Sequence, residues 1–157
     1  METVQSDTLD LARLASELEQ VLKLRTPPIG MKLFESEGAL AAIPKLRRPK
    51  AVHTMDQIVA QAARLGWTLG ATAQDLVGEQ CRAVIGLGGQ DAAWYSGQAM
   101  TGVWFATVED SARHQAAMEV VPAGRYEAIA VAPLAKWPGF GEGARARPRA
   151  RTLKEFM

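Results

Sequence analysis

The sequence has few of the residues that form disulfides or bind soft metal ions. Its 157 residues include one cysteine, Cys81, and two histidines, His53 and His114. A single cysteine allows neither a disulfide within the chain nor a metal cage made of cysteines alone. We therefore expect no metal site, and the scarcity of cysteine favours a cytoplasmic location.

Long hydrophobic runs are absent as well. No apolar stretch approaches the roughly 20 residues that a membrane-spanning helix needs. Residues 1–7 are polar and acidic, unlike the basic start and apolar stretch of a secretory signal. We expect neither export nor a membrane partner.

Excess charge of one sign is also lacking. The chain carries 18 Lys and Arg against 17 Asp and Glu, a formal net charge of +1. A dedicated nucleic-acid-binding surface needs basic residues to neutralise phosphates, so we expect no nucleic-acid partner. Hydrophobic residues make up 48% of the chain and charged residues 22%, which is the balance of a folded globular protein.

The excess of basic over acidic residues lies at the C-terminal end. This end has no apolar periodicity and is rich in glycine, alanine and arginine, a composition typical of disordered segments. We expect residues 1–136 to form a single domain and residues 137–157 to form a basic, disordered tail. The basic residues of this tail are Arg145, Arg147, Arg149, Arg151 and Lys154.

Capping residues, turns and periodicity predict an α+β fold. Thr54 and Gln57 form a capping box at the start of a helix, and Gly66 would end that helix. Ser6 is expected to cap the first helix. A small mixed sheet covered by three or four helices follows from these elements. The predicted helices lie near residues 8–24, 55–65 and 108–119, and the predicted strands at Ile29–Phe34, Val103–Thr107 and Tyr126–Val131.

Cys81 and Arg82 are the candidate catalytic pair. Arg82 and a nearby helix N-terminus would favour the thiolate of Cys81, which is the nucleophilic form. The alternative is that Cys81 is a small buried hydrophobic residue.

Two further segments are candidate binding sites. Gly86, Gly88 and Gly89 form a glycine-rich loop whose backbone N–H groups would bind the anionic part of a cofactor of unknown identity, or which simply forms a tight turn. Trp94 and Tyr95 precede Ser96-Gly97-Gln98 and would line an apolar pocket with polar anchors, or belong to the core.

Two histidines complete the set of candidate residues. His53 with Asp56 would form an acid–base pair at a helix start, or cap at the surface, whereas His114 has no candidate partner near it in the sequence.

A series of motifs runs along most of the chain: Leu22–Phe34, Trp67–Gly70, Asp75-Leu76, Cys81, Gly86–Gly88 and Gly124–Leu134. In this order the motifs resemble the family called "domain of unknown function 169". The resemblance covers about residues 10–135, and the family has no agreed activity, so it implies neither a reaction nor a cofactor. Many relatives carry an additional cysteine where this chain has His53–Asp56, so any metal role in those relatives is not expected here.

The chain departs from this family at Ala135. Relatives continue with another strand and a helix, so the resemblance implies a domain that is truncated or frame-shifted at its C-terminal end. We expect the sheet edge beside Tyr126–Val131 to be uncovered, so that the chain either forms a homodimer through that edge or is poorly soluble.

Two functions follow from these observations. In the first, the protein binds a small molecule, or acts as an accessory protein without a defined reaction, through its glycine loop and aromatic segment. In the second, it is an enzyme that uses Cys81 with Arg82 on an unknown small substrate. Whether the protein is an enzyme stays open at this point.

Overall fold

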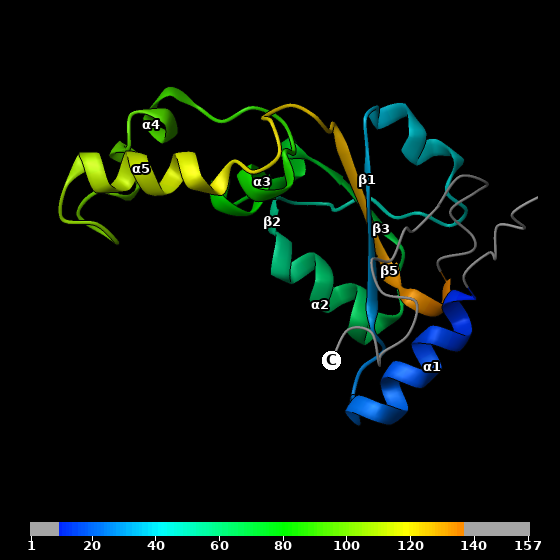
Figure 1. The fold of residues 1–157 in the computed structure, drawn as a ribbon. Helices are drawn as coiled ribbons and strands as arrows, with labels where there is room; N and C mark the ends of the chain where they lie inside the picture. The colour runs from blue at the N-terminus through cyan, green and yellow to red at the C-terminus, as the bar shows by residue number, and fades with distance from the viewer. Residues whose placement is uncertain (1–9, 137–157) are drawn as a thin grey trace, which may run out of the picture.

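The α+β fold class is confirmed by a computed structural model, which describes residues 10–136. Figure 1 shows a sheet with helices against it, and a separate lobe formed by α4 and α5 that projects from the sheet. The elements in chain order are α1 (Leu11–Leu22), β1 (Ile29–Phe34), η1 (Glu37–Ala42), β2 (His53–Thr54), α2 (Met55–Leu65), β3 (Leu69–Thr72), η2 (Ala73–Asp75), β4 (Leu76–Val77), α3 (Glu79–Ile85), α4 (Ala92–Tyr95), η3 (Gln98–Met100), α5 (Val108–Met118) and β5 (Ala128–Pro133).

The central sheet has three antiparallel strands in the order β1-β5-β3. In its register Met31 pairs with Val131, and Ala71 pairs with Ile129. The only parallel strand pair among the described residues, β2 with β4, forms a separate two-stranded sheet. The predicted mixture of parallel and antiparallel pairing is thus divided between two sheets.

Strand β5 divides the hydrophobic core into two layers. All six of its residues are buried, which explains its uninterrupted apolar sequence. Because side chains alternate along a strand, its alanines face α1 and η1, whereas Ile129 and Val131 face α2. The alanines are Ala128, Ala130 and Ala132.

The predicted helix boundaries agree closely with the observed ones. The capping box of Thr54 and Gln57 is present at α2, and Gly66 ends this helix at a φ of 65°. Helix α1 begins after Asp10, whose side chain accepts a hydrogen bond from Arg13 N at 3.0 Å. Ser6, the expected cap of this helix, lies outside the described residues.

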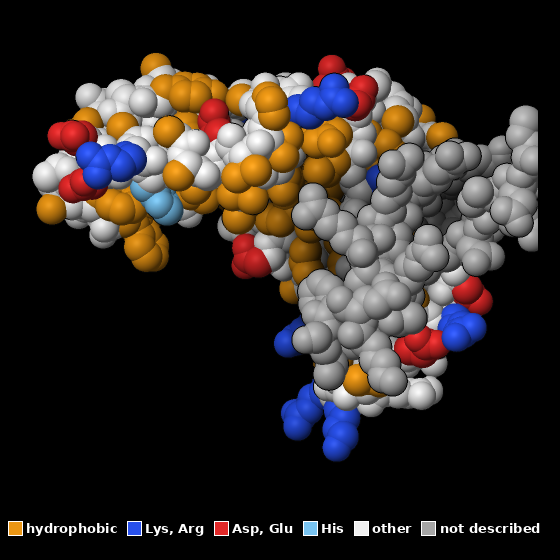
Figure 2. Space-filling model, in the orientation of Figure 1, with side chains coloured by type: hydrophobic (Ala, Val, Ile, Leu, Met, Phe, Trp, Pro, Cys, Tyr) orange, Lys and Arg blue, Asp and Glu red, His pale blue; other side chains and the backbone are white. Residues whose placement is uncertain are grey.

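The predicted strand at Val103–Thr107 is wrong. These residues form a turn between η3 and α5, closed by a 2.8 Å hydrogen bond from Gly102 N to Phe105 O. Val103 and Trp104 are 76% and 73% exposed, and Figure 2 shows hydrophobic side chains at the surface of this lobe. Strand preference depends on packing against neighbouring strands, and this segment has no such neighbour. The third strand of the sheet is β3 instead.

The uncovered sheet edge expected beside Tyr126–Val131 is also absent. Strand β5 is the middle strand and pairs with β1 on one side and β3 on the other. The premise for a homodimer through that edge is therefore wrong. The expected tail, residues 137–157, lies outside the described residues.

Candidate functional site

The lobe is held together by helix caps and one close backbone approach. Asp91 caps α4 by accepting a hydrogen bond from Trp94 N at 2.9 Å, and Thr107 caps α5. Gly97, at a φ of 80°, lies so close to α5 that a β-carbon there would stand 2.7 Å from Ala112 N. The turn after α4 can therefore approach α5 only with glycine at this position.

A cavity of about 210 Å³ lies between α4 and α5. Two of the predicted site residues line it: Trp94, which is 1% exposed, and Tyr95, which is 53% exposed. The Trp94 ring thus forms an inner wall, whereas Tyr95 reaches solvent. The other lining residues are Ala112, Gln115, Ala116 and Glu119.

Helix α5 presents polar side chains to this cavity and to the interior behind it. Ser111, Gln115 and Glu119 follow one another at intervals of one helical turn. Ser111 is fully buried and Gln115 is 1% exposed. Neither the amide nitrogen nor the amide oxygen of Gln115 has a hydrogen-bond partner in the structure, and the same holds for Ser111 Oγ and Glu119 Oε1. Each such buried group costs about 1–3 kcal/mol, so their concentration here needs an explanation.

Sequence reasoning missed this polar face. Helix α5 carries Glu109 and Arg113 on its surface, joined at 3.1 Å, and a helix rich in polar residues suggests solvent exposure on most sides. The signal that identifies the face is the four-residue spacing of Ser111 and Gln115, together with their nearness in the fold to Trp94.

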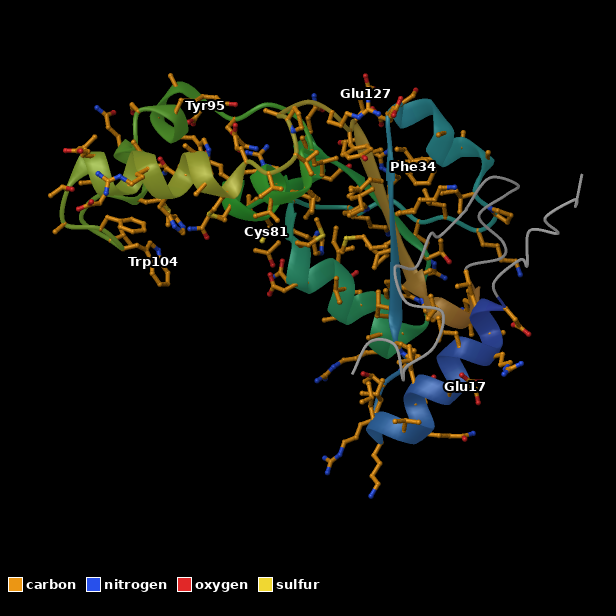
Figure 3. All side chains as sticks on the ribbon, viewed as in Figure 1. Glu17, Phe34, Cys81, Tyr95, Trp104 and Glu127 are labelled. Carbon is orange, nitrogen blue, oxygen red and sulfur yellow. The ribbon has the colours of Figure 1, made fainter. Side chains whose placement is uncertain are left out.

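Cys81 and Arg82 lie elsewhere, on α3. Cys81 is exposed, so the expectation of a buried hydrophobic cysteine is wrong. Arg82 Nη1 donates to the carbonyl oxygen of Ala73 at 3.2 Å, which directs the guanidinium toward η2. Figure 3 shows Cys81 well apart from Tyr95, so the two candidate sites are separate.

The glycine-rich loop packs against the segment that leads into β5. Gly88 N donates to Tyr126 O at 2.9 Å, and Tyr126 N donates to Gly86 O at 3.0 Å. A β-carbon on Gly86 would stand 2.5 Å from Val121 Cγ1, and one on Gly88 would stand 2.6 Å from Ala73 Cβ. These contacts favour a tight structural turn over an anion loop, and neither these glycines nor Gly89 line the cavity.

The histidines are not brought together. His53 Nδ1 lies 2.6 Å from Ala51 O, whereas the His114 ring lies 4.9 Å from that of Phe105, centroid to centroid. Within residues 10–136 no group of three or more His, Cys, Asp or Glu side chains is placed to hold a metal ion. In the same range no helix combines the length and the apolar character needed to cross a membrane.

The comparisons with known proteins identify a family but no activity. The family model of the domain of unknown function 169 (DUF169), described as an uncharacterised ArCR family, matches residues 17–139. The matched segment includes the whole of the lobe. No curated protein and no solved structure matches the chain.

Proposed function

The chain belongs to the DUF169 family, and we propose that it binds a small polar molecule in the cavity between α4 and α5. The observation that carries this proposal is the amide of Gln115, which is buried beside the cavity with both its nitrogen and its oxygen unpartnered. A ligand that pairs with this amide would offset its desolvation.

The lining residues define the chemistry of this ligand. The Gln115 amide offers one donor group and one acceptor, and Glu119 offers carboxylate oxygens that accept hydrogen bonds. The Trp94 ring offers a flat apolar surface. A molecule with an N–H donor and a short apolar part fits these groups, which points to small amides and amines rather than to carboxylic acids.

The size of the cavity limits the ligand further. Its volume of about 210 Å³ lies below the roughly 300–1,000 Å³ of pockets that hold drug-sized ligands. The proposed ligand is therefore a molecule of a few heavy atoms, or one end of a longer molecule. Ordered water is the competing occupant, because it pairs with buried polar groups equally well.

Nuclear magnetic resonance of the tryptophan indole N–H groups tests the proposal. The chain has 4 tryptophans, so the Trp94 signal is assigned with a Trp94→Phe variant. The probes are propionamide, propylammonium and propionate. We expect the Trp94 signal to shift saturably with the first two and to stay unchanged with propionate, which Glu119 would repel.

Two variants of α5 separate a binding role from a structural one. Gln115→Met keeps the shape of the side chain but removes its polar atoms, and we expect it to abolish the saturable shift. Ser111→Ala, also on the buried face but not lining the cavity, is the matched control and should retain the shift. Probe shifts that persist in Gln115→Met, or that never saturate in the natural chain, would overturn the proposal.

A further inference from the structure

The basic loop before β2 is fixed to the sheet at Arg47. Arg47 N donates to Thr68 O at 2.9 Å, and Gly70 N donates to Arg47 O at the same distance, so Arg47 forms a single bridge beside β3. A β-carbon on Gly70 would stand 2.8 Å from the Leu46 side chain, so the approach of this loop depends on that glycine. The backbone that carries Arg47 is thus held in place.

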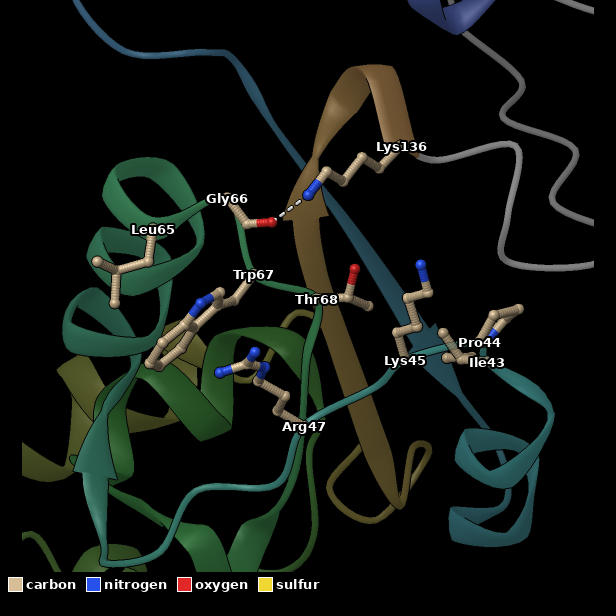
Figure 4. Close-up of a pocket in the computed structure, with 9 residues that line it drawn as sticks. All are labelled: Ile43, Pro44, Lys45, Arg47, Leu65, Gly66, Trp67, Thr68 and Lys136. Atoms are coloured by element: carbon tan, nitrogen blue, oxygen red, sulfur yellow. Dashed lines mark hydrogen bonds between the residues drawn. The ribbon is translucent and has the colours of Figure 1, made fainter.

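The side chain of Arg47 is oriented as well. Its guanidinium carbon lies 4.2 Å from the centre of the Trp67 ring, and Figure 4 shows the two groups side by side. Stacking occupies one face of the guanidinium and leaves the N–H groups along its edge for an acceptor.

Arg47 differs from its neighbour Arg48 in its charge environment. Arg48 is paired with Glu37 at 2.9 Å and with Asp75 at 2.6 Å. By contrast, no ion pair found within residues 10–136 includes Arg47. An oriented arginine without a carboxylate partner is suited to an external anion.

Two cavities meet at the Arg47–Trp67 pair. One has a volume of about 400 Å³ and adds Lys45 and Lys136 to the lining; it is the pocket in Figure 4. The other has a volume of about 560 Å³ and adds Lys50 and Arg48. Neither lining includes an Asp or Glu, so both cavities favour negative charge.

The cavity of Figure 4 also offers apolar surface. Leu65 and Ile43 line it together with Trp67, and Thr68 adds a hydroxyl. Lys136 Nζ donates to the carbonyl oxygen of Gly66, which holds the ammonium at the cavity. An ammonium has three donors, so it retains N–H groups for a second acceptor.

From these observations we propose that the Arg47–Trp67 pair binds a small organic anion. The anionic group, a carboxylate or a phosphate, pairs with the Arg47 guanidinium and with Lys45 or Lys136. The ring or apolar body of the anion packs against Trp67 and Leu65. This site is distinct from the α4–α5 cavity, whose acidic residue Glu119 selects the opposite charge.

Calorimetric titration with four probes tests this site. Benzoate and phenyl phosphate carry the two anionic groups on one ring, inorganic phosphate lacks the ring, and benzamide lacks the charge. At the Trp67 signal we expect benzoate or phenyl phosphate to bind saturably, inorganic phosphate to bind more weakly, and benzamide not to bind; any heat from benzamide would then come from the α4–α5 cavity. Whichever of the two ring anions binds more tightly identifies the source as a carboxylate or a phosphate.

Two arginine variants provide the decisive comparison. We expect Arg47→Gln to raise the Kd of the bound anion about tenfold or more, since a charge-assisted hydrogen bond is lost. Arg64→Gln removes an exposed arginine at the end of α2 that lines neither cavity, and it should leave the Kd unchanged. Equal Kd values for Arg47→Gln and Arg64→Gln, or equal shifts of the Trp67 signal with benzamide and benzoate, would overturn the proposal.

Failure of this site is distinguishable from failure of the first. The anion titration is followed at the Trp67 indole signal, assigned with Trp67→Phe, and should leave the Trp94 signal in place. A shift of Trp94 instead of Trp67 would contradict the anion site and assign the probe to the lobe.

Discussion

Gly97 and Val108 are in closer contact than any other residue type at position 97 would allow. A β-carbon on Gly97 would stand 2.4 Å from the carbonyl oxygen of Val108, and the φ of Gly97 is 80°. The contact joins the turn after α4 to the first turn of α5, and so sets the spacing of the two helices that enclose the cavity.

Gly97→Ala is expected to loosen the lobe. The left-handed backbone costs a non-glycine residue about 1–2 kcal/mol, and the clash with Val108 adds to this cost. Gly102, also at a φ of 80° but with nothing within 4 Å, is the matched control, since Gly102→Ala carries the backbone cost alone. Urea unfolding should show a larger loss for Gly97→Ala. Equal losses would mean that the helices separate freely.

Gln115→Met is expected to stabilise the chain in the absence of ligand. The substitution removes two buried polar atoms that have no partner, and a gain of about 1–3 kcal/mol in the free energy of unfolding follows if no water replaces them. Gln20→Met on the exposed face of α1 is the control and should change little. A loss of stability in Gln115→Met would show that the amide is paired with ordered water.

Asp75 is expected to make the free energy of unfolding depend on pH. Its burial raises the pKa of the carboxyl, but hydrogen bonds from Thr72 and the charge of Arg48 outweigh burial and lower the pKa below the ordinary value of an aspartate. A carboxyl with a lowered folded-state pKa stabilises the fold above its unfolded pKa, and this contribution is lost as the pH falls toward the folded value.

The measurement compares Asp75→Asn with the natural chain. At pH 7 the variant should unfold at a lower urea concentration, and the difference should shrink as the pH falls below about 4. Glu19→Gln, an exposed change on α1, is the control. A difference that is constant between pH 7 and pH 3 would mean that the charge of Asp75 does not contribute.

Alkylation of Cys81 separates the two functions. Because Cys81 is exposed, iodoacetamide should modify it completely in the folded protein, with a change in stability of about 0.5 kcal/mol or less. The Trp94 response to propionamide should survive the modification. If alkylation abolishes this response, the binding site includes Cys81 and the cavity assignment is incorrect.

The sequence predicted those parts of the fold that local signals determine. The capping box at Thr54 and the stop at Gly66 place α2 within a residue, because both act through hydrogen bonds inside their own segment. The alternation of apolar residues likewise placed β1. Strand β3 was missed because its four residues include Gly70 and carry no periodic pattern of their own.

The candidate sites were less accessible to prediction. Trp94 and Tyr95 line a cavity, yet Gln115 and Glu119 line it from the opposite side, from a helix that begins only at Val108. The stacking of Arg47 on Trp67 joins two loop segments, one before β2 and one between α2 and β3. Both arrangements depend on tertiary packing, which residue order alone does not determine.

The position of β5 bears on how the chain folds as it is synthesised. Ile29 pairs with Pro133, and Leu69 pairs with Val131, so both outer strands have their partner in the last described strand. A nascent chain therefore carries β1 and β3 without a strand to pair with until β5 has left the ribosome. Contacts this distant in sequence slow folding. The apolar strands are exposed to chaperones and to other nascent chains throughout that interval.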